Sequence, residues 1–252
     1  ATDDSPFFTR FFKWSALPEL LALRMQGGAP LLQWSYLTRV ATLGQATLAG
    51  LLLLVLPLAI MARRRQPWPS RGCATCFFAV LGLGFLFFEI ALIQALTLLL
   101  GHPLYAVGFV LSAFLLSAGL GAGLAGRMSL TAVTGSIVVL ALCFAPLLTP
   151  LLRSLMGLPL AARMGIAFAV AALPAFFMGM PFPLGLARLT REAAGWTPWA
   201  WAVNGFASVV SPLLAALVAI HFGYRAVMLA AAGLYLVALL AGRSWSPRQH
   251  LR

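Results

Sequence analysis

A single carboxylate in the middle of an apolar run is the first residue that could do chemistry. Glu89 lies within FFAVLGLGFLFFEIALIQALTLLL, residues 77–100, and a helix would place it roughly 17 Å from either end of the run. That is near the midplane of a hydrocarbon core about 30 Å thick. A charge at this depth costs at least about 2.5 kcal/mol, so Glu89 must be protonated, paired, or in contact with protein or water.

Few side chains in the apolar segments could be partners of Glu89. Gln94 is five residues later, about 140° around a helix, so it points to another side. Asn204 and Ser208 are four residues apart and share one helical face, whereas Arg163 is near a segment end and can reach water. Glu89, Gln94, Asn204 and Ser208 are therefore the candidate polar site. Glu89 could be a neutral carboxyl bonded to another helix, a proton or substrate site, or a contact with a partner chain.

A turn and a proline pair could add to this site. His102 and Tyr105 lie in GHPLY, an uncharged turn between two apolar segments, where His102 could cap a helix or act as an ionisable group at the outer mouth. Pro181 and Pro183 in GMPFPLG remove helical N–H donors. They predict a kink that is either structural or a hinge.

Small residues recur at helical spacing in SAGLGAGLAG. Ser117 with Gly121, and Gly119 with Gly123, are pairs four residues apart that predict close packing of helices. Gly121, Gly123 and Gly126 also match the dinucleotide pattern G-x-G-x-x-G. That pattern requires a preceding strand, whereas this copy lies inside an apolar helix.

No residue pattern supports metal, cofactor or catalytic chemistry. Cys73 and Cys76 form a C-x-x-C without a second ligand pair, and Cys143 stands alone. One isolated carboxylate makes no acid and base pair. We therefore expect no cofactor, no metal and no catalytic residue in these residues.

Composition sets the class of protein. Hydrophobic residues make up 62% of the chain and charged residues 9%. A soluble domain of 252 residues does not have this composition. The net charge of +12 comes from residues that separate apolar runs, which is typical of topogenic arginines and argues against nucleic-acid binding. The lipid bilayer is the expected partner.

The lengths of the apolar runs predict an all-α bundle of transmembrane helices, with about seven spans. The expected spans cover residues 38–61, 75–100, 104–125, 130–151, 159–180, 199–220 and 224–242. Residues 1–37 are then an extramembrane or interfacial segment with a short amphipathic helix at 16–26. The last six spans form one bundle over 75–242, 38–61 is an extra transmembrane helix, and 243–252 is a tail.

Arginine placement orients the predicted bundle. The positive-inside rule makes the arginine-rich loop after residue 61 cytoplasmic, and with it the C-terminus. Ten arginines then lie inside, at 63, 64, 65, 71, 127, 188, 191, 243, 248 and 252, and three lie outside, at 153, 163 and 225. Seven spans place residues 1–37 outside, although that segment carries Arg10, Lys13 and Arg24.

Three stretches carry a family resemblance. They are FFEIALIQALTLLLGHPLYAVGFVLSAFLLSAGLGAGLAGR, GMPFPLGLARL, and WAWAVNGFASVVSPLLAALVAIHFGYRAVMLAAAGLYLVALL. In this order they resemble the C-terminal membrane region of polytopic, fused spermidine-synthase-like proteins of the bacterial inner membrane. The opening TDDSPFF looks like the join after a soluble domain. The resemblance implies an upstream aminopropyltransferase-like domain, which would hold any catalytic motif, or a second membrane chain as partner.

The same family is distantly similar to major facilitator transporters. The six segments from 75 to 242 look like one half of that fold, with Arg127 in the position of its basic cytoplasmic loop and FGYRAV before its last helix. This resemblance implies a bundle whose other half lies upstream or on a second chain.

Two functions of different class follow. The first is a non-catalytic membrane domain that anchors or scaffolds an aminopropyltransferase-like domain or a membrane complex. The second is a transporter-like half that moves a small solute, proton-coupled through Glu89, with Gln94 and Asn204 lining its cavity.

Overall fold

The computed structural model describes residues 31–63, 68 and 70–245, and in these residues every regular element is a helix. The elements are α2 (Leu31–Gly50), η2 (Leu51–Val55), α3 (Leu56–Arg63), α4 (Arg71–Leu100), α5 (Pro103–Leu124), η3 (Ala125–Arg127), α6 (Leu130–Leu155), α7 (Leu160–Met178), α8 (Pro181–Ala193), η4 (Ala194–Trp196), α9 (Thr197–Phe222) and α10 (Tyr224–Ser244).

Five stretches of the described residues are long and apolar enough to cross a membrane. They are Arg71–Leu100, Pro103–Arg127, Leu130–Leu155, Leu160–Phe222 and Tyr224–Ser244, of which the fourth contains α7, α8 and α9. The predicted all-helical fold is thereby confirmed for the described residues, and its apolar helices are consistent with a multi-pass membrane protein. The number of spans expected from the sequence, seven, stays a prediction.

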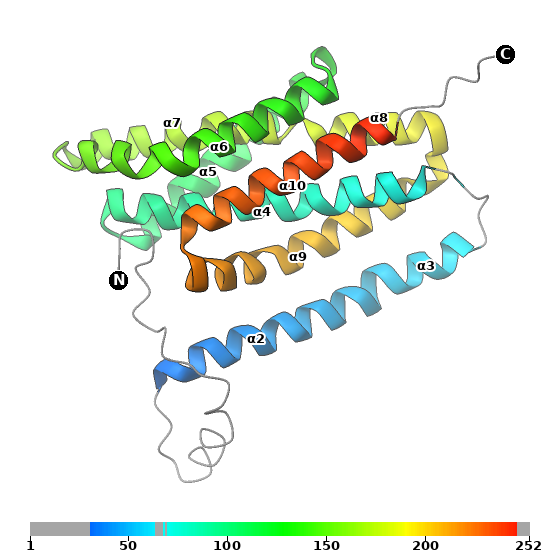
Figure 1. Ribbon diagram of the computed structural model, residues 1–252, viewed down its shortest axis with the longest axis horizontal. Coiled ribbons are helices and arrows are strands. Elements are labelled where there is room, and N and C mark those ends of the chain that lie inside the picture. The colour runs from blue at the N-terminus through cyan, green and yellow to red at the C-terminus, as the bar shows by residue number, and fades with distance from the viewer. Residues whose placement is uncertain (1–30, 64–67, 69, 246–252) are drawn as a thin grey trace, which may run out of the picture.

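Helix α4 forms the centre of the bundle. It packs mainly against α9 and α10, and less extensively against α5, α6 and α7 (Figure 1). More than half of its most apolar stretch is buried, whereas α5 and α6 leave most of theirs exposed. A helix that is apolar on all sides is expected at such a place, because no side of it faces water.

The first described helix is longer than the sequence predicted. It begins at Leu31 instead of residue 38 and continues to Arg63 through η2, a π-helical turn. In Figure 1 this blue helix lies along α9, on the far side from α6 and α7. Gly50 permits the contact, since the ring of Phe206 occupies the place of a Cβ. The short helix expected at 16–26 and residues 246–252 of the tail lie outside the described residues.

Turn residues set the helix ends. Gly101, with φ of 72°, ends α4 in the left-handed conformation that glycine adopts without strain. Gly223, with φ of 83°, separates α9 from α10. The side chain of Ser129 accepts a hydrogen bond from the backbone of Ala132 and caps α6.

Helix α6 contains two prolines, and α10 satisfies the backbone group that one of them leaves free. Pro150 has no N–H to donate to the carbonyl of Pro146, four residues earlier. Arg225 donates to this carbonyl at 3.4 Å and to that of Ala145 at 2.9 Å. The start of α10 is thus fixed to the middle of α6.

Helix α8 is the element that the sequence prediction missed. Its polar and apolar residues are separated on two faces, and it is too short and too charged to be found as an apolar run. Pro181 occupies its first turn, where a missing N–H is tolerated. The expected kink at Pro181 and Pro183 is therefore a break between α7 and a separate helix.

Candidate functional site

Helices α4 and α9 run in parallel and are joined by three hydrogen bonds. Trp199 Nε1 donates to Thr75 Oγ1 at 2.9 Å. Asn204 Nδ2 donates to the carbonyl of Phe78 at 3.1 Å. A third bond of 2.7 Å joins the hydroxyl of Ser211, which is fully buried, to the carbonyl of Leu83. Three polar residues of α9 therefore bond to the first half of α4, two of them to its backbone.

Gly82 brings the two helices close together beside these bonds. A Cβ at this position would lie 2.5 Å from the carbonyl oxygen of Asn204 and 3.0 Å from the Cβ of Ala207. The carbonyl of Asn204 can approach α4 this closely because glycine has no side chain.

A pocket of about 360 Å³ lies between α4, α5, α9, α10 and the junction of α7 with α8. Its wall is mostly apolar and includes Phe85 and Phe182, while Asn204, Ser208 and Tyr235 bring polar atoms to it. The structure thus brings together two of the residues predicted for the site, Asn204 and Ser208.

Glu89 is on the same face of α4 as this pocket. It follows the lining residues Phe85 and Leu86 by four and three positions, which is one helical turn, or roughly 6 Å along the axis. Its side chain is 5% exposed. Among the described residues, no hydrogen bond or ion pair engages its carboxylate. Side chains of a helix lean toward its N-terminus, which directs Glu89 toward the pocket.

Gln94 and Arg163 are separate from this pocket. The Oε1 atom of Gln94 is buried and has no partner among the described residues. Arg163 Nη1 donates at 2.8 Å to the carbonyl of Leu99, in the last turn of α4, where a cation is favoured by the helix dipole. Arg163 therefore caps α4, and its guanidinium is committed to a site away from Glu89.

His102 and Tyr105 are at the opposite end of α4 from the pocket. The Nδ1 atom of His102 accepts a hydrogen bond from the backbone of Leu104 at 3.2 Å, which makes this histidine the N-cap of α5. Its ring lies 5.6 Å from that of Tyr105. His102 follows Glu89 by thirteen residues, or roughly 20 Å along α4. These two residues therefore belong to the turn.

The small residues of α5 differ in what they contact. Gly121 is buried against the backbone of Phe176 in α7, which leaves no room for a Cβ, and Ser117 is buried one turn earlier. Gly179 is similarly placed against the backbone of Ala118. In contrast, nothing lies within 4 Å of a Cβ built at Gly119, Gly123 or Gly126.

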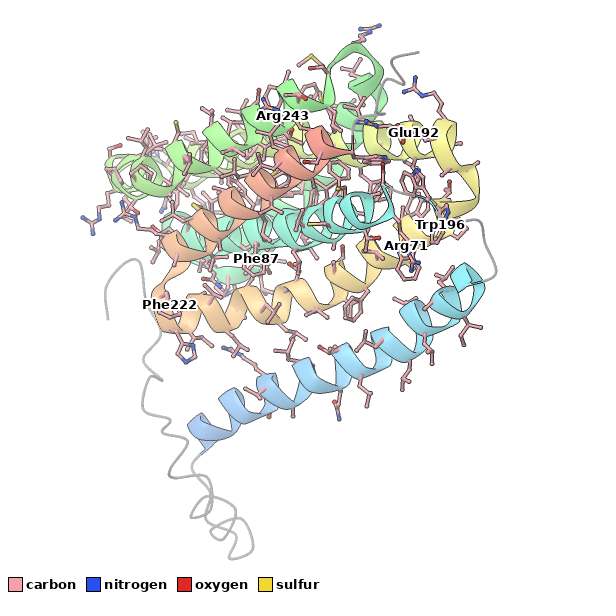
Figure 2. All side chains as sticks on the ribbon, turned by 45° about the vertical axis from the view of Figure 1, so that its right-hand side comes forward. Arg71, Phe87, Glu192, Trp196, Phe222 and Arg243 are labelled. Atoms are coloured by element: carbon pink, nitrogen blue, oxygen red, sulfur yellow. The ribbon has the colours of Figure 1, made fainter. Side chains whose placement is uncertain are left out.

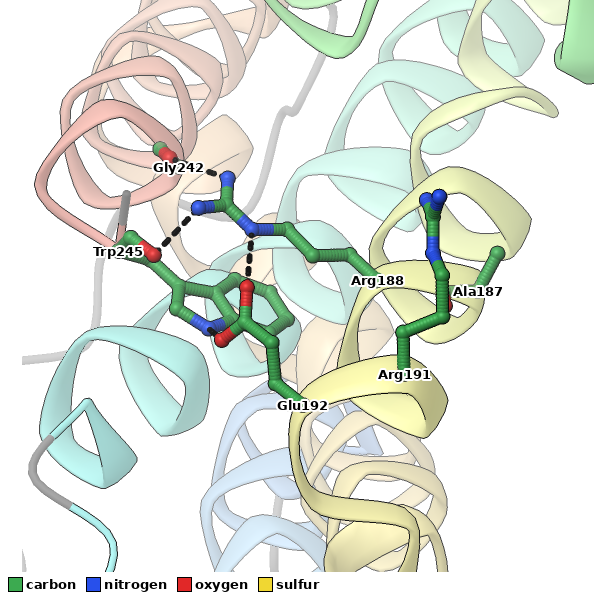
Figure 3. A network of polar contacts seen from close by, with 6 residues as sticks. All are labelled: Ala187, Arg188, Arg191, Glu192, Gly242 and Trp245. Atoms are coloured by element: carbon green, nitrogen blue, oxygen red, sulfur yellow. Dashed lines mark hydrogen bonds and ion pairs between the residues drawn. The ribbon is translucent and has the colours of Figure 1, made fainter. Parts of the chain in front are cut away.

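A polar cluster joins α8 to the end of α10, and the sequence prediction did not include it. Arg188 donates to Glu192 at 3.0 Å, to the carbonyl of Gly242 at 3.1 Å and to the carbonyl of Trp245 (Figure 3). The indole of Trp245 donates to Glu192 at 2.9 Å, and the guanidinium of Arg188 lies 5.0 Å from its ring. The sequence signal for this cluster is the spacing of Arg188 and Glu192, which are four residues apart and of opposite charge.

A second cationic contact is close to the first. The guanidinium of Arg71 lies 4.7 Å from the ring of Trp196 and 5.0 Å from that of Trp199. Arg71, Glu192 and Trp196 are at one end of the bundle and Phe222 is at the other (Figure 2). We call the first of these ends, where α4 begins and α8 lies, the α8 end.

The three cysteines are free thiols. Cys76 and Cys143 are exposed and Cys73 is partly exposed. No group of three or more residues that could hold a metal ion occurs in the part of the chain that the structure describes.

Comparisons of the chain with protein-family models, curated proteins and solved structures found no match. Function is therefore inferred below from the residues and their geometry.

Proposed function

We propose that this chain is a non-catalytic integral membrane domain that anchors or scaffolds an aminopropyltransferase-like domain or a membrane complex. One observation carries the proposal: three polar side chains of α9 bond to α4 itself. Asn204 and Ser211 donate to carbonyls of α4 and Trp199 to Thr75, so these groups hold two helices in register. The family resemblance of the sequence supports the identity of the anchored domain.

The distribution of arginines supports an orientation for this domain in the bacterial inner membrane. Six arginines of the described residues belong to the α8 end, whereas Arg163 and Arg225, at the opposite end, are bonded to helix carbonyls. The α8 end is then cytoplasmic, with the C-terminus, and the chain has seven spans, of which the last six form a major-facilitator-like half. The six are Arg63, Arg71, Arg127, Arg188, Arg191 and Arg243.

Retention of the soluble domain at the membrane tests the scaffold. An aminopropyltransferase-like domain from the same open reading frame, or from a neighbouring gene, is expressed with and without the chain, and membranes are floated on a density gradient. The domain should float with the membranes when the chain is present and stay soluble without it. A domain that remains soluble in both cases contradicts the proposal.

A transporter-like half is the second candidate, and the pocket beside Glu89 favours it. A carboxylate that is buried near the midplane and points toward a pocket is the arrangement expected of a proton or solute site. Its other half would come from a second chain or an upstream segment, with the solute between the halves.

Solute uptake by proteoliposomes separates the two functions. Uptake of radiolabelled spermidine is measured with and without a pH gradient in proteoliposomes that hold the chain together with the segment or second chain of the other half. The chain is native, Glu89→Gln, or Glu192→Gln as the matched change outside the pocket. The scaffold predicts equal background uptake in all three, because a glutamine keeps the shape of Glu89 and a scaffold does not use its charge. Gradient-driven uptake that Glu89→Gln alone abolishes, in protein with unchanged helicity, would establish the transporter instead.

A further inference from the structure

The polar residues of the pocket leave hydrogen-bond acceptors for a ligand. Asn204 donates one hydrogen of Nδ2 to Phe78, and its Oδ1 is an acceptor with no bond of its own within the described residues. The hydroxyl of Ser208 has no hydrogen-bond partner among the described residues and can accept. Glu89, one turn along the same face of α4, adds a carboxylate. Such a set is complementary to a donor that carries positive charge.

Aromatic rings form much of the remaining wall. Phe85 of α4, Phe182 of α8 and Tyr235 of α10 line the pocket from three directions. The faces of aromatic rings carry partial negative charge and attract ammonium groups, most strongly where water is excluded. They also provide apolar surface for the body of a ligand.

The protein supplies no cation of its own to Glu89 within the described residues. The guanidinium of Arg163 is bound to the carbonyl of Leu99, and those of Arg71 and Arg188 are held by aromatic rings and carbonyls at the α8 end. Glu89 is nevertheless buried, with only 5% of its side chain exposed. A carboxylate placed in this way is complementary to the charge of a bound cation.

We propose that the pocket between α4, α5, α8, α9 and α10 binds a small organic ammonium ion. Its charged group lies at the end of the pocket nearest Glu89, and its apolar body lies against Phe85 and Phe182. A volume of about 360 Å³ is at the lower end of the range for small-molecule sites, so the ligand is compact. Binding is independent of whether the chain is a scaffold or a transporter, because it requires only this pocket.

Two probes of equal shape test this proposal. The binding of benzylammonium and of benzyl alcohol to the full chain in lipid nanodiscs is measured at neutral pH by isothermal titration calorimetry. The native chain should bind the ammonium at least about tenfold more tightly, because only the ammonium carries a charge that pairs with Glu89. Equal Kd values for the two probes would overturn the proposal.

Two variants and a control place the site. Glu89→Gln should remove the preference for benzylammonium and leave the Kd of benzyl alcohol unchanged, whereas Glu192→Gln should change neither. Ser208→Leu fills the pocket from α9 and should weaken both probes at least about tenfold. If Glu89→Gln does not fold, as judged by circular dichroism, Ser208→Leu still decides the location. Ammonium binding that survives either folded variant unchanged refutes the site.

Discussion

Replacing Gly82 by alanine should separate α4 from α9. The added Cβ would lie 2.5 Å from the carbonyl oxygen of Asn204 and 3.0 Å from its Nδ2. Backbone atoms cannot move aside as the end of a side chain can. The two helices must therefore shift apart, and the bond from Asn204 to the carbonyl of Phe78 must lengthen.

The cost of this change follows from three contributions. Overpacking a well-packed contact costs about 1–3 kcal/mol. Weakening an interhelical hydrogen bond within a membrane costs about 0.6 kcal/mol more. Replacing a helical glycine by alanine stabilises the helix by up to about 1 kcal/mol, because alanine has the higher helix propensity. With the full gain in helix propensity, the free energy of unfolding should therefore fall by roughly 0.6–2.6 kcal/mol.

Unfolding in mixed micelles by titration with sodium dodecyl sulfate measures this change, with tryptophan fluorescence as the signal. Gly108→Ala is the matched control, because nothing lies within 4 Å of a Cβ there, and its stability should be unchanged or slightly raised. If Gly82→Ala and Gly108→Ala unfold at the same detergent fraction, the close contact between α4 and α9 does not exist as described.

Three further substitutions test other contacts. Arg188→Ala should lower the free energy of unfolding by about 2 kcal/mol and increase hydrogen exchange in the last turn of α10, whereas Arg191→Ala, which loses only a bond within its own helix, should do neither. Ser211→Ala should lower the free energy of unfolding by about 0.6 kcal/mol in the micelle titration. An unchanged free energy of unfolding would show that its bond to α4 does not stabilise the bundle. Arg225→Ala should increase hydrogen exchange in α6 around Pro146, as measured by mass spectrometry, because a carbonyl there loses its donor; unaltered exchange would contradict that role.

The sequence was sufficient for the positions of the apolar helices. Runs of about twenty apolar residues, and turns at Gly101 and Gly223, mark most helix ends to within a few residues, because lipid leaves the backbone few alternatives to helix. Helix α8 was not predicted, because its apolar residues occupy one side only and therefore form no continuous apolar run. Amphipathic periodicity after residue 180 is the sequence signal of such a helix.

Contacts between helices were much harder to predict. Asn204 and Ser208 were correctly grouped on one face, but nothing in the sequence says that this face meets α4 at Gly82. Likewise, Arg163, which the sequence offers as a possible cation for Glu89, is bonded to a carbonyl in the last turn of α4. Backbone acceptors carry no sequence signature, so a pairing that depends on them becomes visible only in three dimensions.

The central place of α4 has a consequence for how the protein is made. Helix α4 is completed at residue 100, whereas α9 and α10, which cover most of it, begin only at residues 197 and 224. During synthesis, about a hundred residues therefore emerge while α4 lacks its two main neighbours. The surrounding leucine and phenylalanine side chains must keep α4 in the lipid during this interval. The order of biogenesis, as much as the finished bundle, thus explains why the helix with the buried carboxylate is also so strongly apolar.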